Sequence, residues 1–392
     1  MSTLRVDAIR HNSATSDAIT MASDGTCTAK LTSIGGGGLS HRNIIVNGAM
    51  NVAQRGSSST SDGFHTVDRF RKDEGGTDES TTQSQVDVSA GTTPYTFGFR
   101  KAFRLTNGNQ TSGAGASDYS NIQYLIEGQD ITNSGWNYKS SSSFITLSFW
   151  VKSSVAQTFY AYARTKDGTN YHYPFSFALS ADTWTKVTKT IPGNSNLQID
   201  NDSGEGMQLT FMQFYGTAFT DSGVTLNAWG ATGGGNVYSP DNTSTWWTTN
   251  DATFEITGVQ FEVGPVATPF EHRSFTEELR RCQRYCFRLG GGDTEQYSCI
   301  GMAVQSHSTT CKAHIQFPVE MRSKDITFTF SGLTLDDDIA SYSGGRVNSV
   351  ASEYSGRNNS SLIFTTASMN NVNVTRILTD AVGGYIQGEC EL

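Results

Sequence analysis

Short runs that alternate apolar and polar residues recur along the middle of this chain, with turn-forming residues between them. Residues 144–152 and 158–164 both alternate in this way, and Lys-Asp-Gly at 166–168 is typical of a hairpin turn. Residues 207–215 are apolar on both faces, as expected of a central strand. No long amphipathic helical stretch separates these runs, which excludes a parallel α/β arrangement. The pattern predicts a mainly β chain with a jelly-roll β-sandwich over residues 43–270.

The first part of the chain, residues 1–42, has a different pattern and contains no aromatic residue. Its apolar side chains stand in short units between polar turns: Leu4, Val6, Ile9, Ile19 and Met21. So little apolar surface cannot form a core by itself. We therefore expect an intertwined β segment that becomes ordered by pairing with other copies of the chain or with a larger assembly. An unstructured tail is the alternative.

A helix is predicted over residues 271–289, where the alternating pattern breaks. Ser274 and Glu277 form a capping box at its start, and the glycines at 290–292 end it. Its apolar side chains follow at spacings of four, three and four residues, as in a heptad seam: Phe275, Leu279, Cys282 and Cys286. A helix this short is marginal on its own. We expect three copies to pack along this seam as a coiled-coil-like trimer.

Residues 290–392 return to alternating patterns, among them 311–317 and 372–378. These runs continue to the last residue of the chain. A second, smaller β-sandwich, which forms a C-terminal knob, is therefore expected.

Composition narrows the class of protein. The chain has 392 residues, of which 36% are hydrophobic, 11% aromatic and 17% charged, and its net charge is −9. The length suggests two or three domains, and the negative charge argues against nucleic-acid binding. We find no apolar run long enough to span a membrane and expect no signal peptide. The 6 cysteines are sparse, so we expect free thiols made in a reducing cytoplasm.

Several runs of sequence are similar to one known family. Residues 43–56 read Asn-Ile-Ile-Val-Asn-Gly-Ala-Met-Asn-Val-Ala-Gln-Arg-Gly, and residues 258–285 begin Gly-Val-Gln-Phe-Glu-Val-Gly-Pro. Residues 317–322 read Phe-Pro-Val-Glu-Met-Arg, and the opening at 4–9 reads Leu-Arg-Val-Asp-Ala-Ile. Together these runs resemble the tail-fibre-like structural proteins of bacteriophages, especially marine and cyanobacterial ones.

The resemblance implies a trimeric virion appendage with a jelly roll similar to carbohydrate-binding modules. It also implies that residues 1–42 attach the chain to other virion tail or capsid proteins. The family's helix often carries a tyrosine where this chain has Cys286, so we expect the packing there to differ.

Motifs for catalysis and metal binding are missing from the sequence. It has no His-Glu-x-x-His zinc motif, no phosphate-binding glycine loop with its lysine and no Gly-x-Ser-x-Gly motif. Cys282 and Cys286 both lie on the apolar seam, which favours packing over zinc binding. The acidic run at 336–338 favours a solvated turn over a calcium site, and no spacing pairs two carboxylates for glycoside cleavage. We expect no metal, no cofactor and no enzymatic activity.

Sugar binding is the stronger chemical candidate. Sugar C–H faces stack on aromatic rings, and sugar hydroxyls pair with amides and carboxylates. Four aromatic residues fall in the turn-rich stretch 227–250, which has little strand alternation: Trp229, Tyr238, Trp246 and Trp247. We predict them as glycan contacts on a loop; packing beneath the loop is the alternative.

The function predicted from these observations is structural: a trimeric tail fibre of a phage virion that links the tail to host-surface recognition. Its expected partners are other copies of the chain and other virion tail or capsid proteins at the N-terminus. Host-surface polysaccharide is a candidate receptor. The alternatives are a capsid or baseplate appendage without receptor binding, and a polysaccharide depolymerase.

Overall fold

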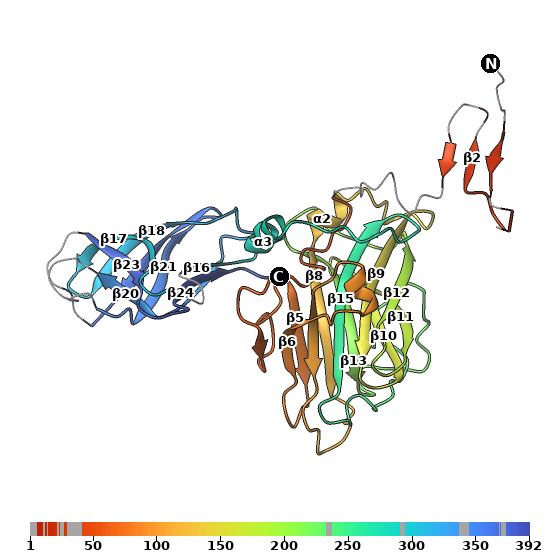
Figure 1. The fold of residues 1–392 in the computed structure, drawn as a ribbon, viewed down its shortest axis with the longest axis horizontal. Helices are drawn as coiled ribbons and strands as arrows, with labels where there is room; N and C mark the ends of the chain where they lie inside the picture. The colour runs from red at the N-terminus through yellow and green to blue at the C-terminus, as the bar shows by residue number, and fades with distance from the viewer. Residues whose placement is uncertain are drawn as a thin grey trace.

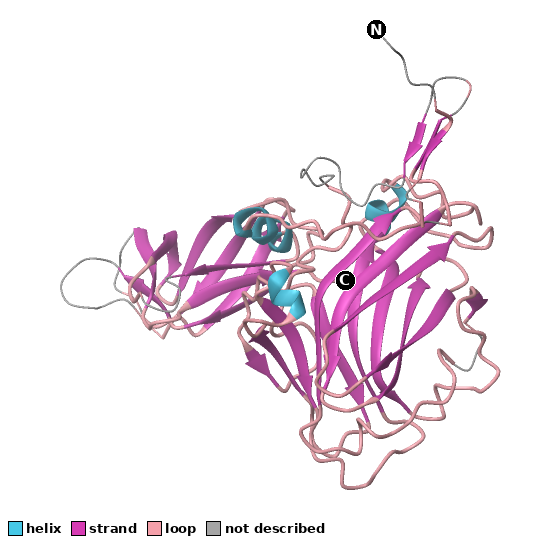
Figure 2. Cartoon of the chain, turned by 45° about the vertical axis from the view of Figure 1, so that its right-hand side comes forward, coloured by secondary structure: helices cyan, strands magenta, loops and turns pink. Residues whose placement is uncertain are grey.

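The computed structural model shows three parts that follow one another along the chain (Figure 1). The described residues are 6–10, 12–13, 15–21, 23, 27–29, 41–232, 237–290, 295–336, 345–367, 369 and 374–392. A small N-terminal sheet stands apart, a large sandwich forms the body, and a smaller β domain extends to one side. Strands dominate both domains and the helices are short (Figure 2). The prediction of a mainly β fold is therefore confirmed.

Two six-stranded antiparallel sheets enclose one core in the large domain. The front sheet has the order β14 (Gly230–Ala231), β11 (Tyr171–Leu179), β10 (Gln157–Thr165), β13 (Glu205–Tyr215), β8 (Tyr119–Glu127) and β5 (Phe70–Gly75). The back sheet has the order β12 (Thr185–Pro192), β9 (Phe144–Ser153), β15 (Thr253–Val263), β7 (Lys101–Thr106), β6 (Thr82–Asp87) and β4 (Ser58–Ser59). From β7 to β10 the chain changes sheet at every step, as in a jelly roll.

Alternation along the strands builds the core between the two sheets. Phe149 of β9 projects from the back sheet and meets Phe211 and Phe177 of the front sheet, with ring centroids 5.0 and 5.5 Å apart. Strand β13, predicted as central because it is apolar on both faces, lies between β10 and β8 inside the front sheet. Because alternate side chains of β13 point into the core, the others are left to form a surface on the outer face.

The smaller domain is a second sandwich, in which a three-stranded and a six-stranded sheet enclose one core. One sheet has the order β16 (Cys286–Gly290), β24 (Tyr385–Glu389) and β19 (Thr327–Ser331). The other has the order β20 (Leu333–Asp336), β23 (Val374–Thr379), β17 (Cys299–His307), β18 (Thr310–Gln316), β22 (Asn359–Thr365) and β21 (Ser349–Ser355). Phe287, Phe317 and Phe328 pack together in its core, with ring centroids 4.9 to 6.5 Å apart.

Helix α3 (Phe275–Gln283) joins the two domains and is shorter than predicted; α1 (Thr93–Thr96) and α2 (Gly128–Thr132) are shorter still. The Oγ atom of Ser274 accepts a hydrogen bond from the backbone N–H of Glu277 at 3.2 Å, which confirms the predicted N-cap. The prediction that the helix continues to residue 289 is wrong, because Cys286 belongs to β16 and pairs with Glu389. Pairing with β24 and burial of Phe287 stabilise this segment more than another helical turn would.

The four predicted seam residues do not form one exposed stripe. Cys282 and Cys286 are fully buried within a single chain, Leu279 is half-buried, and Phe275 is 58% exposed. The prediction that both cysteines face other copies is therefore wrong, because each packs inside its own chain. Burial raises the pKa of both thiols well above the ordinary value, so they stay protonated.

The N-terminal sheet consists of β1 (Ala8–Ile9), β2 (Ile19–Met21) and β3 (Cys27–Ala29), which pair within one chain. Val6, Ile9 and Met21 are exposed, and Ile19 is half-buried; Leu4 lies outside the described residues. A sheet with its apolar side chains on the surface has no core of its own. Intertwining with other copies stays a prediction.

Buried charges join the large sandwich to the smaller domain. The Nη2 atom of Arg55 lies 2.8 Å from one carboxylate oxygen of Glu391, and Arg69 donates to the other oxygen. Both arginine side chains are almost fully buried. Arg55 also pairs with Asp68 at 3.6 Å and with Glu389 at 3.1 Å, whereas Glu391 is the one carboxylate that the described residues place against Arg69. Removing Glu391 would therefore leave the charge of Arg69 buried and unpaired, which is costly in a protein interior. The relative position of the two domains is therefore set by this joint.

We expect Glu391→Ala to lower the free energy of unfolding by about 3–5 kcal/mol, because it removes the carboxylate that Arg55 and Arg69 share. Glu320→Ala is the matched control, since Glu320 pairs with Arg357 at 3.1 Å on the exposed surface. Such surface pairs contribute about 0–1 kcal/mol. Denaturant unfolding measures both variants. Equal effects of the two substitutions would contradict a joint held by buried charge.

A second carboxylate at the joint makes stability depend on pH. Burial alone would raise the pKa of Glu127, but hydrogen bonds from Arg284, at 2.8 Å to each oxygen, and from Tyr285 hold it below its ordinary value. A carboxylate with a lowered pKa stabilises the folded state above the unfolded-state pKa of about 4.3. This contribution is lost as the pH falls through the folded-state pKa.

We therefore expect the free energy of unfolding of the native protein to fall more steeply below about pH 4 than that of the Glu127→Gln variant, because the glutamine side chain does not titrate. Urea unfolding at a series of pH values measures the two slopes. Parallel stability curves for the two proteins would show that Glu127 does not titrate as its contacts require.

Candidate functional site

Two of the tryptophans predicted as glycan contacts are core residues. Trp246 and Trp247 each have 0% exposed surface. Trp247 packs against Phe214 with ring centroids 5.1 Å apart, and its Nε1 donates to the carbonyl of Gly113 at 2.8 Å. The amide of Asn107 donates to both tryptophan carbonyls. The prediction that these two side chains contact glycan is wrong: they pack beneath the loop, where burial of two indoles stabilises the fold.

Trp229 also packs against the sandwich. Its ring meets Tyr173 edge-on with centroids 5.5 Å apart, and its Nε1 donates to the carbonyl of Pro192 at 2.7 Å. It is half-buried. Trp229 does not line the cavity described below, so the structure does not bring it together with Tyr238.

Tyr238 lies on the outer face of the front sheet, within a group of aromatic rings. Its ring stacks on Tyr162 of β10, with centroids 5.0 Å and planes 12° apart. Tyr215 of β13 meets Tyr238 at 6.0 Å, and Tyr119 of β8 meets Tyr215 at 6.0 Å. Phe219 lies 5.4 Å from Tyr119. These five rings, the aromatic cluster, stand on the side of the sheet away from the core.

Strand geometry explains why side chains gather on this face. Alternate residues of β10 join the core, beginning with Phe159, and this leaves Tyr162 and Arg164 on the outer face. The register then places Thr210 of β13 opposite Tyr162 and Gln208 opposite Arg164. The alternation of this strand is evident in the sequence, whereas the role of its outward side chains is not.

The aromatic cluster and its polar neighbours enclose a cavity of about 420 Å³. The polar part of its lining consists of Arg71, Asp73, Gln123, Arg164, Lys166 and Gln208. This volume falls in the range of small-molecule sites, about 300–1,000 Å³. Aromatic faces beside amide and charged groups suit a ligand that has both C–H faces and hydroxyls.

The polar side chains of the cavity are partly held by one another and partly unsatisfied. Gln123 and Asn121 donate to one oxygen of Asp73 at 2.7 and 3.2 Å, and Arg71 lies 3.6 Å from the other oxygen. Within the described part of the chain, the buried Nε atoms of Arg71 and Arg164, both of which line the cavity, have no hydrogen-bond partner. Buried polar atoms of this kind are normally satisfied by ligand or water.

His172 lies beside Tyr238 and carries no charge at neutral pH. The two ring centroids are 6.0 Å apart, and Nδ1 of His172 is 3.1 Å from the hydroxyl of Thr232. Burial lowers the pKa of His172 to about 4, and the positive charge of Arg164 acts in the same direction. The charges of the cavity therefore come from its arginines, its lysine and Asp73.

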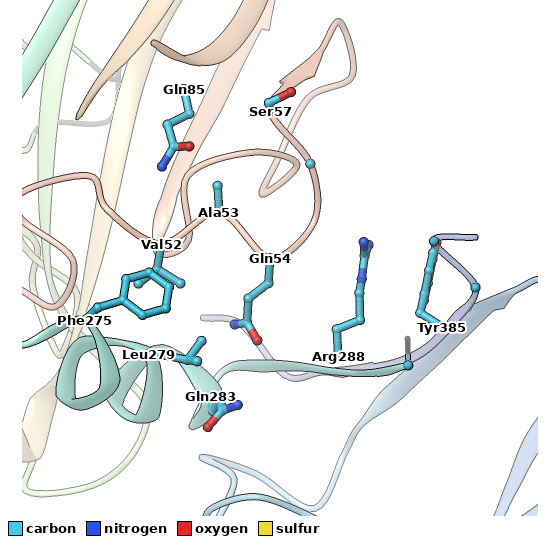
Figure 3. Close-up of a pocket in the computed structure, with 14 residues that line it drawn as sticks. Val52, Ala53, Gln54, Ser57, Gln85, Phe275, Leu279, Gln283, Arg288 and Tyr385 are labelled. Carbon is cyan, nitrogen blue, oxygen red and sulfur yellow. The ribbon is translucent and has the colours of Figure 1, made fainter. Parts of the chain in front are cut away.

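A second hollow, of about 640 Å³, lies at the junction of the two domains (Figure 3). Phe275 and Leu279 of α3 lie near Val52 on one side, and Arg288 and Tyr385 lie on the other. The guanidinium of Arg288 stacks 3.8 Å from the centroid of the Tyr385 ring. None of the described residues that line this hollow is a carboxylate or a histidine. Its chemistry is that of a contact surface.

Thiol, imidazole and carboxylate side chains are the groups with which a protein holds a metal ion. Among the residues whose side chains the structure describes, five cysteines are free thiols: Cys282, Cys286, Cys299, Cys311 and Cys390. Across the described ranges, no three His, Cys, Asp or Glu side chains are grouped so that they could hold a metal ion. Among the described helices, none has the length and apolar character needed to cross a membrane.

Comparison with known proteins gives matches in structure alone: no family model and no curated protein matches the sequence. One similar structure is a family 11 carbohydrate-binding module from a cellulosomal cellulase of Clostridium thermocellum, at 14% identity and TM-score 0.26, covering 55% of this chain and 98% of that one. Another is the N-terminal cellulose-binding domain of β-1,4-glucanase C from Cellulomonas fimi, at 13% identity and TM-score 0.26, covering 55% and 99%.

A family 16 carbohydrate-binding module is also similar, at 11% identity and TM-score 0.23, covering 46% of this chain and 84% of that one. All three TM-scores lie below 0.5. The description of the jelly roll therefore depends on the two sheets and on the path of the chain between them.

Proposed function

We propose that this protein binds carbohydrate in the cavity on the outer face of the front sheet. The observation that carries the proposal is the aromatic cluster, which stands beside amide and charged side chains in one hollow. Tyr119 and Phe219 are half-buried, whereas Tyr162 and Tyr215 are almost fully covered. Tyr119 and Phe219 are therefore the rings on which a sugar would stack, while the covered tyrosines keep them in position.

The proposed activity is binding without cleavage. Most glycoside hydrolases use two carboxylates, one on each side of the scissile bond. Among the described residues that line the cavity, Asp73 is the single carboxylate, and it is already engaged by Arg71, Asn121 and Gln123. This arrangement supports a binding site over a polysaccharide depolymerase.

We further propose that the chain works in a virion, as a trimeric tail fibre that carries this glycan site to the host surface. The resemblance of residues 43–56 and 258–285 to phage tail-fibre-like proteins supports this role. So do the exposed apolar side chains of the N-terminal sheet, which suit attachment to other tail or capsid proteins. A capsid or baseplate appendage, on which the site would have no receptor to bind, is the alternative.

The glycan site is tested with Tyr119→Ala and Tyr119→Phe, which remove the whole ring or the hydroxyl alone. We expect the alanine variant to bind glycan roughly 2- to 10-fold more weakly, since one stacked aromatic contact contributes about 0.5–1.5 kcal/mol. The phenylalanine variant should bind almost as well as the native protein. A glycan array that includes polysaccharide from host cells identifies a ligand, and calorimetry then gives the affinities.

Trp184→Ala is the matched control, because Trp184 is a half-buried aromatic on the outer face of the back sheet. Its substitution should leave glycan binding unchanged. If native protein bound no glycan on the array, or if Trp184→Ala and Tyr119→Ala weakened binding equally, the front-sheet site would be rejected.

The trimer is tested by light scattering on the purified chain. We expect a mass three times the 42.5 kDa of one chain. Phe275→Ser should dissociate the trimer without unfolding the chain, because Phe275 is the seam residue with an exposed side chain. A native protein that stays monomeric at all concentrations would contradict the proposal.

A further inference from the structure

We infer that the front-sheet cavity selects acidic carbohydrate, and that Arg164 binds the carboxylate of a uronic acid residue in the ligand. This inference rests on the proposed function, because it names the class of sugar that the same cavity takes. It depends on the distribution of charge in the cavity and on the position of Arg164 in it.

Arg164 is a cation whose described contacts are all with neutral groups. Its Nη1 donates to the hydroxyl of Tyr238 at 3.3 Å, and its guanidinium carbon lies 5.4 Å from the centroid of the same ring. Its Nη2 lies 2.8 Å from the amide of Asn170, in the amide orientation that satisfies both of that side chain's polar atoms. These contacts position the guanidinium but leave its charge without compensation.

The other cations of the cavity are already paired with carboxylates. Lys166 lies 3.2 Å from Glu205, and Arg71 lies 3.6 Å from Asp73. With Glu205 counted, two carboxylates face the three cations of the described lining, and Arg164 is the cation that neither of them pairs with. The charge of Arg164 is thus the one in this lining that a bound anion would compensate.

A carboxylate fits this position better than a sugar hydroxyl does. The planar guanidinium presents paired N–H donors that match the two oxygens of a carboxylate. Arg164 is half-buried beside the ring of Tyr238, and a charge pair is stronger where contact with water is reduced. Dissolved salt limits the repulsion between the acidic protein and a polyanion to about 8–10 Å. Recognition of the acid must therefore come from contacts inside the cavity.

The sheet order shows how an extended ligand would lie. Strands β10, β13, β8 and β5 are consecutive neighbours, so Arg164 on β10 and Arg71 on β5 are separated by three strand spacings, or about 14 Å. A short oligosaccharide that crosses these strands would reach both ends. Its acidic residue belongs at the Arg164 end, while the mixed pair of Arg71 and Asp73 suits hydroxyls at the other.

The test compares one oligosaccharide in two forms: a uronic acid oligomer, such as oligogalacturonate or oligoalginate, and its carboxyl-reduced, neutral counterpart. Native protein should bind the acidic form at least 10-fold more tightly, and this preference should shrink as salt is added. Arg164→Gln should bind the acidic form roughly 10- to 100-fold more weakly, the usual effect of losing a charge-assisted hydrogen bond. It should bind the neutral form with nearly unchanged affinity.

Arg100→Gln is the matched control, because Arg100 also stacks on a tyrosine, 3.9 Å from the ring centroid of Tyr95, but lies outside the cavity. It should retain the preference for acid. Arg164→Lys should retain part of it, since the charge remains while the planar donor pair is lost.

The outcomes separate this inference from the proposed function. Equal binding of acidic and neutral forms, or an unchanged preference in Arg164→Gln, would overturn the role of Arg164 while carbohydrate binding stands. If native protein bound neither form of these oligomers nor any glycan on the array, both the inference and the proposed function would fail.

Discussion

Two buried arginines of the large sandwich, Arg55 and Arg69, share the carboxylate of Glu391 from the smaller domain. A buried charge without a partner costs several kcal/mol, so the domains cannot separate or rotate without breaking these pairs. A second pair at the same junction joins the half-buried Arg284 to the fully buried Glu127. After α3 the chain enters β16 and pairs with β24, the strand that directly precedes Glu391.

A rigid sandwich also determines where the candidate site can lie. One set of side chains on β8, β10 and β13 fills the core between the sheets, and the alternate set is left on the outer face. Tyr162 and Arg164 are fixed there by the strand, while Tyr238 and Phe219 come from the connections that cross the edge of the sheet. Binding groups on strands are held more accurately than groups on loops, which suits recognition of a flexible polysaccharide.

The strands and the mainly β class were predictable because alternation is a local property. The runs at 144–152 and 207–215 correspond to β9 and β13, and the centrality of β13 followed from its apolar character on both faces. The site was predicted less well. Trp246 and Trp247 stand in a turn-rich stretch, where sequence does not distinguish a side chain on the surface from one tucked beneath the loop. The signal that could have located the site was Tyr162 with Arg164 on the outward face of a central strand.

The sequence alone determined the secondary structure of most segments and which side chains share a face, because these depend on neighbours a few residues apart. Tertiary structure alone decided the order of the strands, the end of α3 and the burial of Cys282 and Cys286. Each of these depends on a partner far along the chain: Cys286 is a strand residue because Glu389 lies beside it. The cavity also depends on contacts far along the chain, because its walls come from five separate segments that only the folded sheet brings together.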